Sequence, residues 1–294
     1  MAASSPPAKP SPRLVVRSSS SLAAPVQDAA ASALDGSHLM LAGGLTAADL
    51  SSPAIQIVSG RSDRLVGQLP GAVHDAAAVL LGRDVYVFGG GNGLAQLDGI
   101  TRIDRSGRTT SAGRLPAPSS DQAAAGIGNT AYVVGGYTGT RWLDTIVAWG
   151  PRTSARVVAH LPTPVRYAAV TAVAGRLLIA GGSLPNGNAS RAVYTYTPGG
   201  RVLRVATLAT PTTHAAAAAL GGTAFVLGGR GASAGTPTAR IVAVDLGQRR
   251  TRPAGRLPQA LSDLAAVQLA NRIVVVGGRG LRGTVATVTQ LAKG

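Results

Sequence analysis

One apolar pattern recurs along the chain: a short run of apolar residues that ends in two glycines. The six copies read LMLAGG, VYVFGG, AYVVGG, LLIAGG, AFVLGG and IVVVGG, with first glycines at positions 43, 89, 135, 181, 228 and 277. The copies are therefore spaced 46, 46, 46, 47 and 49 residues apart. A fixed period of this length indicates a repeat architecture in which each repeat is one supersecondary unit.

The second copy illustrates what one repeat contains. An alanine-rich run (75–81) is followed by a short turn and by VYVFGG, and a variable loop then leads to GITRID (99–104), a glycine turn and TTSAGRLPAP (109–118). Short apolar segments between glycine-bearing turns, without a 3.6-residue period, are typical of β-strands. Each repeat is predicted to be a blade of four antiparallel strands, and the whole an all-β, six-bladed β-propeller.

The repeats resemble those of the Kelch family, whose blades share a glycine doublet at the end of the second strand and a period near 50. The resemblance covers residues 13–294. The family's aromatic residue near the end of the third strand is matched by Trp149 and Tyr196, while Ile103 and Val244 stand at the equivalent positions of other repeats. The family's fourth-strand tryptophan is missing. The resemblance implies a Kelch-type propeller.

The two chain ends are predicted to meet in the last blade. Only 16 residues follow Gly278, enough for a third strand (about 284–291) but not a fourth. The segment RLVVRSSSSLAAP (13–25) reads like the fourth-strand segment RVLRVATLATP (201–211). We therefore expect the N-terminal strand to close the last blade of a single domain spanning 13–294 and to remove an open sheet edge. Residues 1–12, rich in Pro, Ser and Ala, are predicted to be a disordered leader or linker.

Two sets of polar residues are predicted to share one face of the propeller. Antiparallel strands place the start of each alanine-rich first strand beside the loop after each doublet. The inner set precedes the alanine runs: Asp28, Asp75, Asp121, Arg166, Tyr167, His214 and Asp263. The outer set lies in the loops: Tyr137, Arg141, Trp142, Arg191, Arg230 and Arg279. Arginine forks and aromatic faces suit a polar ligand, whereas short polar side chains also commonly bind their own loop amides.

We interpret the chain as a non-catalytic module that binds an unknown protein or carbohydrate ligand through this loop face. The alternative is a carbohydrate-acting enzyme of the mutarotase or epimerase kind, known among six-bladed Kelch-like proteins, with His214 and an aspartate as acid and base. No cofactor or metal is expected, because no blade has two ligands at close metal-site spacing. The absence of cysteine excludes disulfides and thiolate chemistry.

Positive charge adds a third possibility. The chain has 28 basic and 12 acidic residues, a net charge of +16, and no glutamate. Either GC-rich codon usage or an acidic partner accounts for this excess, and the second explanation makes the protein a binder of anionic surfaces or polymers through an arginine-rich rim. Fifteen arginines fall in the fourth-strand segments and the turns before them: Arg13, Arg17, Arg61, Arg64, Arg105, Arg108, Arg114, Arg152, Arg156, Arg201, Arg204, Arg249, Arg250, Arg252 and Arg256.

The apolar runs and the N-terminal tail bear on location and assembly. No apolar run approaches the roughly 18 residues of a membrane span, so no transmembrane segment is expected. The Pro/Ser/Ala leader resembles a stalk, which favours an extracytoplasmic or cell-surface location, with a cytoplasmic protein as the alternative. The protein is expected to be a monomer.

Overall fold

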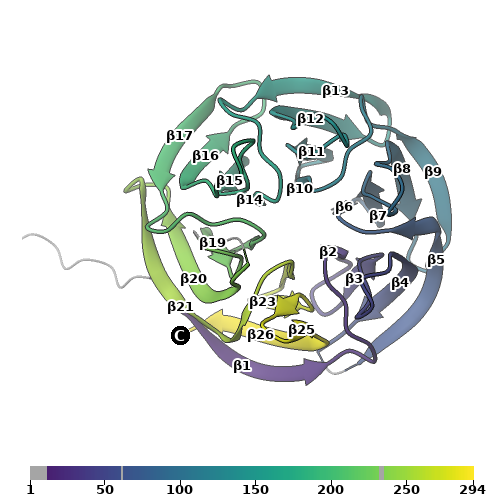
Figure 1. Ribbon diagram of the computed structural model, residues 1–294, viewed down its shortest axis with the longest axis horizontal. Helices are drawn as coiled ribbons and strands as arrows, with labels where there is room; N and C mark the ends of the chain where they lie inside the picture. The colour runs from purple at the N-terminus through teal and green to yellow at the C-terminus, as the bar shows by residue number, and fades with distance from the viewer. Residues whose placement is uncertain (1–11, 61, 232–234) are drawn as a thin grey trace, which may run out of the picture.

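The computed structural model describes residues 12–60, 62–231 and 235–294. The predicted leader, apart from Pro12, and Arg61 lie outside these ranges. Six four-stranded antiparallel sheets stand radially around one axis (Figure 1), which confirms the all-β, six-bladed propeller. Within the described ranges every regular element is a strand, and no helix long and apolar enough to cross a membrane is found.

The first five blades each use four consecutive strands, ordered from the axis to the rim. Their bounds are β2 (Ala30–Ala33), β3 (Leu39–Ala42), β4 (Ser52–Val58) and β5 (Asp63–Val73); β6 (Ala77–Leu81), β7 (Asp84–Phe88), β8 (Gly99–Ile103) and β9 (Thr109–Arg114); β10 (Ala123–Ile127), β11 (Thr130–Val134), β12 (Thr145–Gly150) and β13 (Thr153–His160); β14 (Ala169–Val173), β15 (Arg176–Ala180), β16 (Ala192–Tyr196) and β17 (Val202–Thr207); and β18 (Ala216–Leu220), β19 (Thr223–Leu227), β20 (Thr238–Asp245) and β21 (Arg250–Leu261).

The sixth blade joins the two ends of the chain. It consists of β22 (Ala265–Leu269), β23 (Arg272–Val276), β26 (Thr287–Lys293) and, outermost, β1 (Leu14–Ser21). β1 pairs antiparallel with β26, and the two strands lie side by side at the rim in Figure 1, so the predicted closure by the N-terminal strand is confirmed. A small ladder of β24 (Arg279–Gly280) and β25 (Gly283–Thr284), which the sequence did not predict, occupies the loop after the last doublet.

The hydrophobic core is divided into six clusters, each shared by neighbouring blades. Second strands such as β7 and β11 are buried almost throughout, because a blade stands against each of their faces. This explains why they read as continuous apolar runs instead of alternating ones. Between the second and third blades, Trp149 packs on Tyr86 and Phe88 with ring centroids 4.8 and 5.6 Å apart.

The glycine doublets let each second strand approach the connection into the next blade. Gly135 has a φ of 63°, and a Cβ at this position would overlap the carbonyl oxygen of Val165. The N–H of Gly136 donates to that same oxygen at 2.9 Å. All six doublets repeat both features with the corresponding connection. The doublet is therefore a contact between consecutive blades as well as a turn.

Replacing Gly135 with alanine is expected to lower the free energy of unfolding by about 2 kcal/mol more than replacing Gly128 does. Gly128 is the matched control: its φ is 59°, but beyond its chain neighbours no atom lies within 4 Å of the place that a Cβ would occupy, so alanine there adds backbone strain alone. Urea denaturation of both variants measures the difference. Equal losses would contradict a packing role for the doublet.

Candidate functional site

Six residues, one from each blade, form a ring at the mouth of the axial channel. Each stands just before an innermost strand and has a φ between 52° and 62°: Asp28, Asp75, Asp121, Tyr167, His214 and Asp263. The backbone N–H of each ring residue donates to the carbonyl of the one in the preceding blade at 2.8 to 3.2 Å, and Asp28 closes the circle on Asp263. Left-handed backbone is uncommon outside glycine and is often retained at functional sites.

The ring surrounds a cavity of about 170 Å³ that opens onto the loop face. Four consecutive residues from each blade line it, beginning with the ring residue and continuing mainly with alanines. Further along the axis a second space of about 310 Å³ is lined mostly by Ala and Val, with Ser32 and Gln268 among the polar residues. Small side chains on the innermost strands thus leave room on the axis, and the polar chemistry is concentrated at one end.

The acidic half of the ring is an arc of four aspartates in neighbouring blades. Its two ends are neutralised by arginines: Arg230 Nη2 lies 2.6 Å from Asp263 Oδ2, and Arg166 Nη2 lies 2.6 Å from Asp121 Oδ2. Ser262 Oγ also donates to Asp263 at 2.5 Å. Each arginine comes from the other half of the ring, so the two ion pairs join the halves.

Asp28 and Asp75, the middle of the arc, have no arginine within ion-pair distance among the described residues. Both touch the cavity but are otherwise enclosed by protein. Burial, and then the neighbouring carboxyl groups, raise the pKa of each well above its ordinary value. Both carboxyl groups are therefore harder to ionise than an exposed aspartate, and a carboxyl group that keeps its proton can donate a hydrogen bond as well as accept one.

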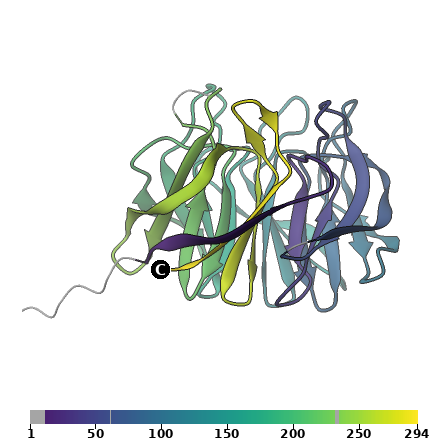
Figure 2. The same cartoon turned by 90° about the horizontal axis from the view of Figure 1, so that it is seen from below.

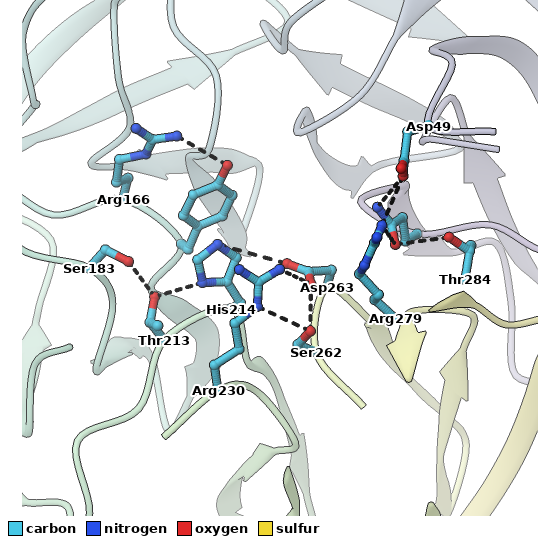
Figure 3. A network of polar contacts seen from close by, with 12 residues as sticks. Asp49, Arg166, Ser183, Thr213, His214, Arg230, Ser262, Asp263, Arg279 and Thr284 are labelled. Carbon is cyan, nitrogen blue, oxygen red and sulfur yellow. Dashed lines mark hydrogen bonds and ion pairs between the residues drawn. The ribbon is translucent and has the colours of Figure 1, made fainter. Parts of the chain in front are cut away.

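The other half of the six-residue ring consists of Tyr167 and His214, whose aromatic side chains stack on each other. The centroids of Tyr167 and His214 are 3.7 Å apart, with an interplanar angle of 22°. His214 Nδ1 lies 3.0 Å from Thr213 Oγ1, and His214 Nε2 faces Asp263 Oδ1 at 3.9 Å (Figure 3). Burial lowers the pKa of His214 to about 4 and raises that of Tyr167. At neutral pH both side chains are uncharged.

Arg166 links the ring to an aromatic cluster. Its guanidinium carbon lies 4.7, 5.1 and 4.9 Å from the ring centroids of Tyr137, Trp142 and Tyr167, and its Nη2 donates to the Tyr167 hydroxyl at 3.1 Å. Tyr137 and Trp142, from the loop after the third doublet, form an edge-on pair 6.2 Å apart. Aromatic faces and the arginine hold each other in place beside the mouth.

The remaining predicted residues lie farther from the cavity. Arg279 binds Asp49 at 2.8 Å and Gln27 at 3.3 Å, and thereby joins the sixth blade to the first (Figure 3). Arg141 is exposed at a loop tip. The Arg191 side chain donates to the carbonyls of Leu208 and Ala209 within its own blade, so the structure does not bring it to the mouth.

Three polar contacts of the site were not predicted. Gln27, Thr213 and Ser262 each precede a ring residue. Thr213 contacts the ring residue His214 itself, Ser262 accepts from Arg230, the partner of Asp263, and Gln27 accepts from Arg279. Their position in the sequence could have identified them, because each stands directly before a ring residue. In the structure each is paired by a β-bridge with the residue that follows a glycine doublet. Arg166 occupies the same place in its blade, which makes this position a regular second layer around the ring.

Comparison with known proteins identifies the fold only. No protein-family model matches the sequence, and none of the curated proteins matches it. Among solved structures, one titled "Structure of YjhT" superposes with a TM-score of 0.79 over 92% of this chain and 96% of that chain, at 14% sequence identity. At this identity the likeness extends to the propeller fold and to nothing finer.

Proposed function

We propose that the protein is a Kelch-type, non-catalytic binding module that holds a small polyhydroxylated ligand, of the carbohydrate class, at the channel mouth. The observation that carries the proposal is the closed ring of six left-handed residues, which turns a polar side chain from every blade into one cavity. Glycine meets such a backbone requirement without strain, so polar side chains in all six places point to use of those side chains.

The chemistry of the mouth favours hydroxyl groups. The raised pKa values of Asp28 and Asp75 favour protonated carboxyl groups, which donate and accept hydrogen bonds, while Asp121 and Asp263 lie in ion pairs with arginines. His214 and Tyr167 add uncharged polar groups, so no net charge on the ligand is needed. Few precisely placed polar groups around a small concave site are typical of small-molecule binding.

The proposal is tested by thermal shift with glucose, galactose, glucuronate and galacturonate. We expect one or more of these sugars to raise the melting temperature of the native chain, and His214→Gln to abolish the rise. His160→Gln is the matched control, because His160 is an exposed histidine on the outer strand β13, paired with Asp144 at 3.1 Å. A rise that persists in His214→Gln, or none with any of the four sugars, contradicts binding at the mouth.

A second candidate function rests on one specific observation. A histidine with its pKa lowered to about 4 and aspartates with raised pKa values share a single cavity, which is the pairing of base and acid that sugar mutarotation or epimerisation requires. Polarimetry of freshly dissolved α-glucose and α-galactose separates the two functions. A protein-dependent acceleration lost in His214→Gln supports the enzyme, whereas a thermal shift without acceleration supports the binding module.

A further inference from the structure

The face opposite the channel mouth carries a concentration of exposed positive charge. Because the ring residues stand just before the first strands, the turns between first and second strands, and between third and fourth strands, lie at the other end of each blade. We call this the turn face; it is the lower side in Figure 2, opposite the yellow β24–β25 hairpin. Ten exposed cationic residues lie there: Arg13, Arg83, Arg105, Arg108, Arg152, Arg176, Arg201, Arg249, Arg250 and Lys293.

Acidic residues on the turn face do not neutralise this charge. Five aspartates lie in or beside the same turns: Asp35, Asp63, Asp84, Asp104 and Asp245. Four of them are half-buried, and each already accepts from a neighbouring backbone or side-chain group. Within the described part of the chain, Arg108 is the one member of the ten that forms an ion pair, with Asp104 at 3.3 Å.

The mouth side of the molecule has a different balance. Seven aspartates lie on it: Asp28, Asp49, Asp75, Asp98, Asp121, Asp144 and Asp263. Arg114, Arg166, Arg230 and Arg279 are paired with four of them. The excess of arginine over aspartate in the sequence is therefore located mainly on the turn face.

The arrangement of the charges fits a flat partner. The cations come from the turns of the second to the sixth blade, so they surround most of the axis instead of following one groove. A rod-shaped polyanion laid across the face contacts only part of such a ring, whereas a planar anionic surface meets all of it at once. The exposed large apolar residues, such as Leu50, Leu94 and Leu281, lie in mouth-side loops or on outer strands and not in these turns.

We propose that the turn face docks the propeller onto an anionic lipid bilayer. Arginine guanidinium groups pair bidentately with lipid phosphates, and each cation near an anionic surface adds to the attraction. Because no apolar anchor lies on the described part of this face, docking is electrostatic, reversible and weakened by salt. The channel mouth then points away from the bilayer and stays open to solution.

The test is co-sedimentation of the full chain with vesicles of phosphatidylcholine containing phosphatidylglycerol, compared with pure phosphatidylcholine. We expect binding to the anionic vesicles only, and its loss when salt is raised from about 0.1 M to 1 M. The triple variant Arg83→Ser, Arg176→Ser, Arg201→Ser should bind on the order of 100-fold more weakly. These three exposed side chains make no ion pair within the described part of the chain, so folding should be preserved, which the melting temperature checks.

A matched control removes the same charge from the mouth side. Arg114 ends β9 on the mouth side, Arg256 lies in the mouth-side half of β21, and Arg282 lies in the β24–β25 turn. Replacing all three with serine should leave vesicle binding within about threefold of the native value. Replacing the three turn-face arginines with lysine should retain most of the binding. Equal weakening by both serine triples, or binding to heparin or duplex DNA without binding to anionic vesicles, overturns the proposal.

Discussion

A chain that begins at residue 22, without strand β1, is expected to lose its cooperative unfolding transition and to associate into oligomers. β1 contributes seven paired positions to the ladder with β26. Its Leu14 is only 2% exposed and packs in the cluster that contains Ile241 and Leu291. Removing the strand opens the edge of β26 and the contact between the fifth and sixth blades. This loss is comparable with the whole stability of a domain, about 5–15 kcal/mol.

Circular dichroism melting and light scattering measure this effect. A chain that begins at residue 12 keeps β1 and serves as the control for removing the preceding residues. A synthetic peptide of residues 12–24 added to the truncated chain should restore the transition, because β1 then pairs with β26 in trans. A truncated chain that stays monomeric with an unchanged melting temperature would show that closure of the ring does not require β1.

The fold was predictable because its signals are local and repeated. Six doublets fixed the number of blades, and the likeness of 13–25 to other fourth strands placed β1 beside β26. The β24–β25 ladder was missed because it involves four residues in a variable loop. Such a short pairing leaves no period in the sequence.

The sequence predicted where the candidate site lies, but not which of its residues contact one another. The start of each first strand identified all six ring residues, yet nothing in the sequence indicated their left-handed backbone or the closed circle of hydrogen bonds. Pairing across blades depends on side-chain direction, which spacing does not contain. Arg166 therefore reaches back to Asp121 of the preceding blade, while Arg191 stays within its own blade.

Replacing both Asp28 and Asp75 with asparagine is expected to raise the free energy of unfolding at pH 8 and to reduce its decline with rising pH. Burial and neighbouring carboxyl groups raise the pKa of both aspartates in the folded state. Between the unfolded-state pKa of about 3.9 and the raised folded-state pKa, the unfolded chain has released protons that the folded chain still holds. Stability therefore falls as pH rises toward the folded pKa, by about 1.4 kcal/mol per pH unit for each retained proton.

His214 changes the free energy of unfolding with pH in the opposite direction, so its contribution must be separated from that of the aspartates. Its folded pKa of about 4 lies below the ordinary histidine value, so it lowers stability as pH falls from 6.5 toward 4. Urea denaturation of the native chain and the double asparagine variant between pH 4.5 and 8.5 isolates the aspartates, because His214 is present in both chains and its effect cancels in the difference. Asp98→Asn, at an exposed ion pair with Arg114, is the matched control and should leave the slope unchanged. If the double variant is less stable than the native chain at pH 8 and keeps its slope, the folded-state pKa of the central pair is not raised, and the donor role proposed for these two carboxyl groups is wrong.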